Sequence, residues 1–243
     1  MVGFGDPHTV RSFDEELAHL NEMIARMGGL AETQMANALQ AILDGDEAKA
    51  KQVVEDDHQI DAVHAQVEEF AIRMLALRQP MADDLRAIIQ SLKAAATLER
   101  VGDNAASCAK RVHVLHESPA VPPLKSAVRM GWLVLDMLKQ SVDAYLRRDM
   151  DRAIAIRNRD TEVDDFYSSL FRELLTYMME DTRNITPCTH LLFVAKNLER
   201  IGDQATNLAE MTHYLVTGKT LKGERPKNDT SSFTIVEPKH FEG

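Results

Sequence analysis

The sequence has few of the residues that interrupt or bend helices. Its 243 residues include only eleven glycines and eight prolines, and no proline lies between Pro7 and Pro80. Glycine and proline disfavour the interior of a helix more than any other residues. Aromatic residues, which are enriched in β-strands, make up only 5% of the chain. This composition favours helices and disfavours a sheet.

Cysteines, basic residues and long apolar runs are also scarce. Two cysteines exclude a disulfide scaffold and favour a reducing compartment. The sequence contains no stretch of 18 apolar residues, so no membrane span is predicted, and residues 1–7 show no secretory signal. Acidic residues outnumber basic ones by 38 to 28, giving a net charge of −10, which disfavours binding to nucleic acid or anionic lipid. We therefore expect an acidic cytoplasmic protein that neither inserts into a membrane nor binds nucleic acid.

The apolar residues recur at spacings of three and four. One such series consists of Ile60, Val63, Val67, Phe70, Met74 and Leu77. A second consists of Phe13, Leu17, Leu20, Ile24, Met27 and Ala31. This spacing places the apolar residues along one face of a helix. The periodicity predicts amphipathic helices that pack against one another.

Helix boundaries can be predicted from capping residues and prolines. Asp46 and Asp149 precede helical patterns and are expected N-caps. The proline-rich segment 118–123 separates two helices. We predict six long helices, near residues 9–43, 46–78, 82–116, 124–147, 149–181 and 185–217. Their short connections favour antiparallel neighbours, so the predicted fold class is all-α.

The chain contains an internal duplication. The segment Leu98–Ala105, LERVGDNA, recurs at Leu198–Ala205 as LERIGDQA. An ungapped comparison of residues 85–115 with 185–215 gives eleven identities in 31 positions, far above chance. The preceding helix repeats at an offset of 103. We therefore expect two tandem three-helix bundles, at 1–118 and 119–217, followed by a polar tail at 218–243.

The repeated residues include pairs of carboxylates four positions apart, two pairs in each half. The eight residues are Asp57, Asp61, Glu99, Asp103, Asp160, Asp164, Glu199 and Asp203. Side chains at this spacing lie on one helix face and repel one another. A cation would relieve that repulsion, and oxygen ligands suit Mg²⁺, Mn²⁺, Ca²⁺ or iron better than structural zinc. Relative to the apolar faces, Glu99 and Asp103 fall on the flank and outer face, which predicts open sites.

Two alternatives to open metal sites remain on the residues alone. In the first, the acidic faces are simply solvated, with Arg100 and Arg200 neutralising them, in a helical scaffold that holds no metal. The second is a carboxylate-bridged metal-binding bundle with storage or oxidase activity, whose ligands would point into the bundle core. The Glu-x-x-His spacings at 16/19 and 55/58 are those of ferritin-like proteins, but neither is duplicated.

The sequence shows no catalytic constellation. It has no glycine-rich phosphate loop, GxSxG or HExxH motif. No motif pairs a nucleophilic side chain with a general base. We therefore expect a protein that is not an enzyme. Gly102 and Gly202 stand in both copies inside a predicted helix, where glycine costs about 1 kcal/mol relative to alanine. Close helix packing or access for an ion would explain them.

The duplicated unit, with LERxGD in its third helix and DxxxD in its second, resembles the PhoU family of phosphate-signalling regulators. The resemblance covers residues 10–217. It implies a cytoplasmic, non-enzymatic all-α protein of two three-helix bundles with pseudo-twofold symmetry, expected to form a homodimer. It also implies contact with the high-affinity phosphate ABC transporter, through its ATPase and membrane components, and with a sensor histidine kinase. Such proteins repress the phosphate-starvation response when phosphate is plentiful.

The resemblance also implies metal sites. PhoU-like proteins bind metal ions or clusters through E(D)xxxD pairs, which here are the eight carboxylates named above. The implied metals are divalent or trivalent ions such as Mg, Mn, Fe or Zn. The implied location is the cytoplasm, peripheral at the inner membrane through the partners.

Overall fold

The computed structural model describes residues 7–221 and residue 234. Within these residues every regular element is a helix. The elements are α1 (Pro7–Asp44), α2 (Glu47–Arg78), α3 (Asp83–Ala109), α4 (Val112–Glu117), α5 (Pro123–Arg147), α6 (Met150–Glu180), the 3₁₀ helix η1 (Thr182–Asn184) and α7 (Ile185–Thr217). The all-α prediction is confirmed. Most of the polar tail expected at 218–243 lies outside the described residues.

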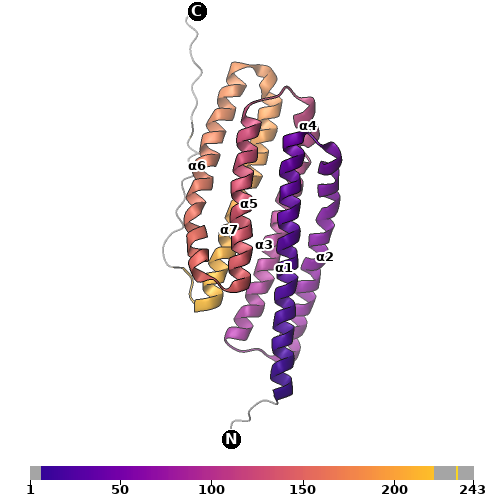
Figure 1. The fold of residues 1–243 in the computed structure, drawn as a ribbon, viewed down its shortest axis with the longest axis vertical. Helices are drawn as coiled ribbons and strands as arrows, with labels where there is room; N and C mark the ends of the chain where they lie inside the picture. The colour runs from indigo at the N-terminus through magenta and orange to yellow at the C-terminus, as the bar shows by residue number, and fades with distance from the viewer. Residues whose placement is uncertain (1–6, 222–233, 235–243) are drawn as a thin grey trace, which may run out of the picture.

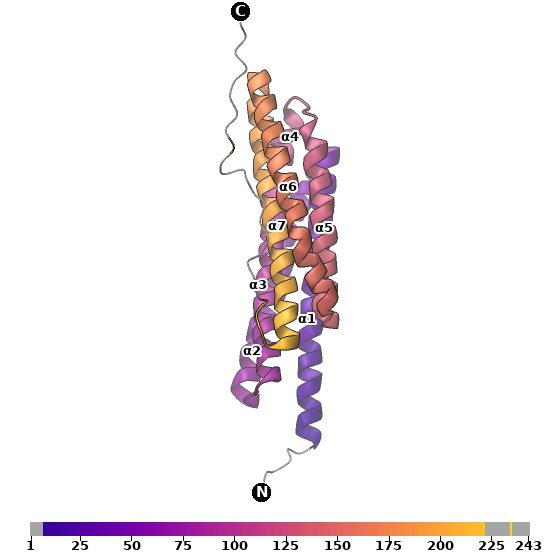
Figure 2. The same ribbon diagram turned by 90° about the vertical axis from the view of Figure 1, so that its left-hand side faces the viewer.

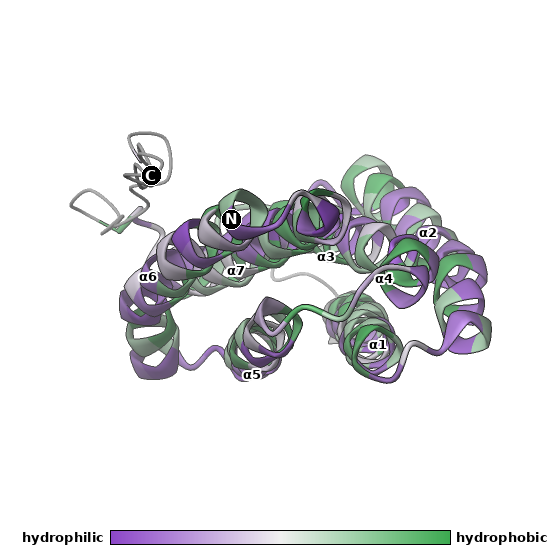
Figure 3. Cartoon of the chain, turned by 90° about the horizontal axis from the view of Figure 1, so that it is seen from above, coloured by the Kyte–Doolittle hydropathy of each residue, from purple (hydrophilic) through white to green (hydrophobic). Residues whose placement is uncertain are grey.

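The helices form two layers that run the length of an elongated molecule (Figures 1 and 2). Helices α6, α7, α3 and α2 lie side by side in one layer, and α5 and α1 form the other (Figure 3). Helix α1 packs on α2 and α3, and α5 packs on α6 and α7. The apolar core lies where the layers meet.

The two halves of the chain join through equivalent helices, α1 against α5 and α3 against α7. Helices α1 and α5 make one kind of contact twice: a glycine of each helix packs against an aliphatic side chain of the other. A Cβ on Gly28 would lie 2.6 Å from Val142 Cγ1, and a Cβ on Gly131 would overlap Leu39. Both glycines and both partners are 103 residues apart, which is the offset of the sequence repeat. This exchange is what a pseudo-twofold axis between two related units produces. The boundary expected at residue 118 stays a prediction.

Most helix signals in the sequence appear in the structure. Asp46 accepts a hydrogen bond from the Lys49 backbone N–H at 2.9 Å, and Asp149 accepts one from that of Arg152 at 3.0 Å, so both N-caps are confirmed. In the apolar series of α2, Ile60, Val63, Val67 and Met74 are buried and Phe70 is half-buried. Leu77, expected in that series, is instead 74% exposed near the end of α2.

The expected helix at 82–116 is broken in two. The Arg111 backbone N–H donates to the Cys108 carbonyl three residues earlier, and helical bonding resumes with Leu115 N–H to Arg111. The Arg111 guanidinium lies 4.3 Å from the centre of the Phe193 ring on α7. No proline or glycine lies at this turn, so no local signal predicts the break between α3 and α4.

The two cysteines are expected to be unreactive in the folded protein. Cys108 is 1% and Cys188 0% exposed. Burial raises the pKa of the Cys108 thiol to about 12 and also raises the pKa of the Cys188 thiol. Because the thiolate is the reactive form, we expect neither thiol to react with DTNB at pH 8, and both to react in guanidinium chloride. Rapid release of thionitrobenzoate from the native protein would contradict this packing.

Candidate functional site

The carboxylates of the first repeat lie where α2 and α3 pack together. Asp57 and Glu99 are half-buried, and Asp61 and Asp103 are exposed. Burial raises the pKa of Glu99, and the neighbouring carboxylates of Asp103 and Asp61 raise it further. Negative charge from two helices is therefore gathered at one open place, as the sequence predicts for this repeat. We call these four residues the first carboxylate set.

Asp57 is fixed from both sides. The Gln34 side-chain amide on α1 donates a hydrogen bond to Asp57 Oδ1 at 2.8 Å. A Cβ on Gly102 of α3 would lie 2.8 Å from Ile60 Cδ1 and 3.0 Å from Asp57 Oδ1. The glycine therefore lets α2 approach α3 and leaves room for the aspartate. In the second repeat a Cβ on Gly202 would lie 3.2 Å from Val163 Cγ1 on α6, a looser contact. Both glycines nevertheless face the packed neighbouring helix, which supports close packing as the reason for them.

His64 joins the first carboxylate set and was missed by sequence reasoning. It follows Asp61 by three positions on α2. Its proximity favours the charged form of Glu99 and so offsets part of the rise in the pKa of that carboxyl. Its Nε2 atom is buried and makes no hydrogen bond within the described residues, and Glu68 Oε1 is 3.6 Å away. A neutral imidazole nitrogen is a common metal ligand. The only sequence signal is the Asp-x-x-His spacing, which is not repeated in the second half.

The carboxylates of the second repeat lie between α6 and α7 and are largely buried. Asp160, Asp164 and Glu199 are 2%, 4% and 6% exposed, and Asp203 is half-buried. The outward placement expected from the apolar face of the helix therefore holds for the first repeat and is wrong for the second. We call these four residues the second carboxylate set.

Polar groups within the protein contact two members of the second carboxylate set, Asp160 and Glu199. The Thr206 hydroxyl donates to Asp160 Oδ1 at 3.1 Å. The Lys196 ammonium forms an ion pair with Glu199 Oε2 at 2.9 Å. The same ammonium lies 5.1 Å from the centre of the Tyr167 ring on α6. Buried carboxylates need such partners, because an unpaired charge is costly away from water.

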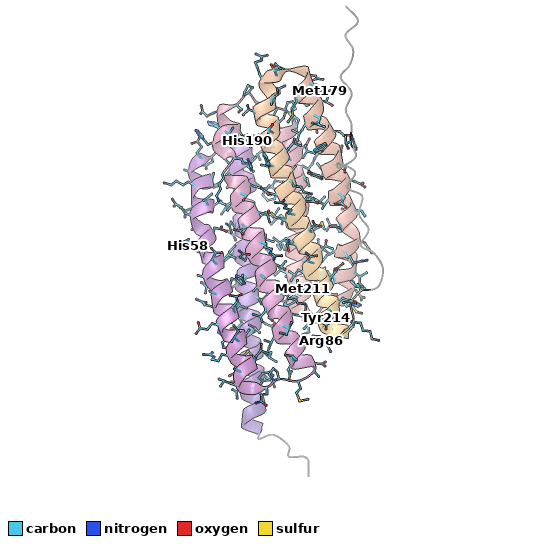
Figure 4. All side chains as sticks on the ribbon, turned by 180° about the vertical axis from the view of Figure 1, so that it is seen from behind. His58, Arg86, Met179, His190, Met211 and Tyr214 are labelled. Carbon is cyan, nitrogen blue, oxygen red and sulfur yellow. The ribbon has the colours of Figure 1, made fainter. Side chains whose placement is uncertain are left out.

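A polar cleft of about 450 Å³ lies between α3 and α7. Arg100 and Arg200, the arginines of the two LERxGD motifs, both line it, and so does Asp103 of the first carboxylate set. Both motifs therefore meet at the seam between the halves. Figure 4 looks onto this layer, with Arg86 and Tyr214 close together at one end of the seam and His190 toward the other.

The structure brings the predicted ligands near one another without closing a metal cage. Among the residues that the structure describes, no three acidic, histidine or cysteine side chains are arranged to hold a metal ion. The residue types of the first carboxylate set nevertheless fit a hard cation, and His64 Nε2 makes no hydrogen bond within the described residues. The eight-carboxylate assignment stays a prediction.

The two Glu-x-x-His pairs lie apart from these sets. Glu16 forms an ion pair with Arg78 at 2.8 Å, and His19 lies 3.5 Å from Glu22. His58 contacts the backbone carbonyl of Glu55 and is exposed. Neither pair points toward a shared cluster in the core, which disfavours a ferritin-like centre built on them.

The described helices include none that is both long enough and apolar enough to cross a membrane. Comparison with known families adds the deciding observation. The PhoU domain matches the chain twice, at residues 24–112 and 127–212. The chain belongs to the PhoU family.

Curated PhoU relatives cover nearly the whole chain. The phosphate-specific transport system accessory protein PhoU homolog of Caulobacter vibrioides is 51% identical over 226 residues, covering 93% of this chain and 98% of that protein. The protein of the same name from Rhizobium meliloti is 50% identical, covering 93% and 95%.

Solved PhoU structures share the fold. The crystal structure of PhoU from Pseudomonas aeruginosa gives a TM-score of 0.83 at 40% identity, covering 85% of this chain and 100% of that one. The phosphate transport system regulatory protein PhoU from Streptococcus pneumoniae gives 0.79 at 31% identity, covering 86% and 99%. The resemblance seen in the LERxGD and DxxxD motifs is therefore confirmed.

Proposed function

We propose that this chain is a non-enzymatic accessory regulator of a phosphate-specific transport system. The observation that carries the proposal is the PhoU domain matched in both halves, with near-complete coverage by relatives named for that role. The chain acts in the cytoplasm and reaches the inner membrane through its partners. It works as an adaptor, binding proteins rather than converting a substrate.

The adaptor has two partners. It contacts the ATPase and membrane components of the phosphate ABC transporter, and it contacts a sensor histidine kinase. When phosphate is plentiful, this contact keeps the phosphate-starvation genes silent and restrains phosphate uptake. The working form is a homodimer. The family resemblance supports these roles, and the elongated two-layer bundle offers long helical faces for both contacts (Figure 1).

The first carboxylate set binds a divalent or trivalent cation, of the class of Mg, Mn, Fe or Zn. Asp61, Glu99 and Asp103 supply oxygen ligands, and His64 supplies a nitrogen. The cation offsets the burial of Glu99 and its repulsion by Asp103 and Asp61, which together raise its pKa. Because its ligands come from both α2 and α3, the bound ion holds these helices in register and shapes the outer face that a partner meets.

Deletion or depletion of the gene in the source bacterium tests the adaptor role. We expect alkaline-phosphatase reporter activity to become high in phosphate-rich medium, and to return to low when the intact gene is restored. A gene carrying Glu99→Gln and Asp103→Asn is expected to restore repression only in part, because the α2–α3 face loses its cation. A Lys125→Met gene is the matched control, since Lys125 is exposed on α5, which belongs to the fold's other layer.

Reporter activity that stays low after deletion, with normal phosphate uptake, would contradict the adaptor role. Oxygen consumption by the purified protein with ferrous iron would instead favour the oxidase alternative.

A further inference from the structure

The surroundings of the two carboxylate sets differ at positions that the duplication makes equivalent, and two of these differences bear on charge. Lys196 of α7 corresponds to Ala96 of α3, one hundred residues earlier. Tyr167 of α6 corresponds to His64 of α2, at the offset of 103. Both changes fall beside the carboxylates, and the carboxylates themselves are retained. The repeats have therefore kept their charges and diverged in the groups that surround them.

The two changes act together in the second repeat. The Lys196 ammonium lies 2.9 Å from Glu199 Oε2 and 5.1 Å from the centre of the Tyr167 ring. A carboxylate and an aromatic face both attract an ammonium group. Glu199 is 7% exposed along its side chain, compared with 39% for Lys196. The lysine therefore reaches inward from the surface and places its charge against a buried acid.

In the first repeat neither group is present. Ala96 has no charge to offer, and His64 presents a buried nitrogen in place of the tyrosine ring. The Glu99 carboxylate there is opposed by Asp103 and Asp61, with His64 and Arg100 as the nearby groups that favour its charge. The set is open to solvent at Asp61 and Asp103. An ion from solution can reach it without displacing a cation of the protein.

We infer that Lys196 is the built-in cation of the second carboxylate set, so that only the first set takes up a metal ion. This inference rests on the metal site of the proposed function. The second set contains Asp160 and Asp164, each under 5% exposed, and its charge is already offset by an ammonium group and the Thr206 hydroxyl. A metal would have to expel the lysine and open a buried interface. The first set would gain a charge partner at no such cost.

With this inference, the two halves of a pseudo-symmetric molecule are unequal in metal binding. Helices α6 and α7 are held together through the ammonium group of a protein side chain, Lys196. Helices α2 and α3 are held together by a metal ion that binds reversibly. A partner that responds to metal would therefore bind the α2–α3 face, and a partner that does not would bind elsewhere.

Titration with MnCl₂ tests the inference on the full chain after removal of metal with a chelator. Free Mn²⁺ is measured by electron paramagnetic resonance. We expect Glu99→Gln to abolish binding by the natural protein, and Glu199→Gln to leave the amount of bound Mn²⁺ unchanged. We expect Lys196→Ala to double the bound Mn²⁺, and the added half to disappear in the Lys196→Ala, Glu199→Gln double variant.

The reciprocal change gives a test that does not depend on the Lys196→Ala protein folding. Ala96→Lys places an ammonium beside Glu99, and we expect it to abolish Mn²⁺ binding. Circular dichroism checks the fold of each variant. The inference is overturned if Glu199→Gln halves the binding by the natural chain, or if folded Lys196→Ala binds no more Mn²⁺ than the natural chain. Absence of binding by the natural chain, with a gain in Lys196→Ala, would instead remove the proposed first site and keep the role of Lys196.

Discussion

Replacing Lys196 with methionine is expected to lower the free energy of unfolding by about 3 kcal/mol in the presence of a chelator. The change keeps the length of the side chain and removes its charge. Glu199 then loses its ion-pair partner while it stays buried beside Asp160 and Asp164. Removing one partner of a buried ion pair costs about 3–5 kcal/mol, and the lower end applies because Lys196 is 39% exposed. Urea denaturation followed by circular dichroism measures the change.

Two comparisons show whether the loss of stability comes from the missing ion pair or from an unspecific effect of replacing a lysine. Lys125→Met removes an exposed lysine of α5, and a surface change of this kind is expected to alter stability by no more than about 0.5 kcal/mol. Added Mn²⁺ should restore part of the stability lost by Lys196→Met, since a ligand that binds only the folded state stabilises it. Equal stability of the Lys196→Met and natural proteins in chelator would show that the buried carboxylates do not depend on the lysine.

The fold could be predicted from the sequence because its signals are local or repeated. Asp46 and Asp149 cap helices through their own backbone neighbours, so their role needs no tertiary information. The duplication of LERxGD fixes two equivalent units, and the short connections make neighbouring helices antiparallel. At the break between α3 and α4, Arg111 contacts Phe193, a residue from a distant part of the chain. No local pattern near residue 110 predicts a contact of that kind.

The candidate site could be predicted only in part, for a similar reason. The spacing of Glu99 and Asp103 gives their helix face, and the structure places both at the exposed edge of α2–α3. The same spacing at Glu199 and Asp203 predicts the same exposure, yet Glu199 is buried. Burial of the helix flank depends on which side chains of α6 and α7 close over it, and Lys196 is one of them. Helical periodicity describes the apolar face well and says little about such a flank.

Valine at position 131 is expected to lower the free energy of unfolding by about 2–3 kcal/mol, the upper part of the range for inserting methyl groups into a packed core. Gly131 lies where α5 crosses α1, and a Cβ there would overlap the Leu39 side chain, with Leu39 Cγ at 3.1 Å. Leu39 is 1% exposed, so it is packed in the core, where an added side chain forces its neighbours to shift. The strain falls on a contact that joins the two halves of the chain.

Gly29→Ala is the matched control for Gly131→Val, because no atom lies within 4 Å of a Cβ added at Gly29. That change should raise stability by about 0.5–1 kcal/mol, since alanine favours the helix and restricts the unfolded chain. Gly28→Ala tests the pseudo-symmetric copy of the contact, where the added Cβ meets Val142 Cγ1 at 2.6 Å. Opposite effects at the adjacent positions 28 and 29, measured by urea denaturation, would locate the strain at the α1–α5 crossing. Equal stabilisation by both alanines would show that α1 and α5 move apart easily, and that the two halves are joined chiefly through α3 and α7.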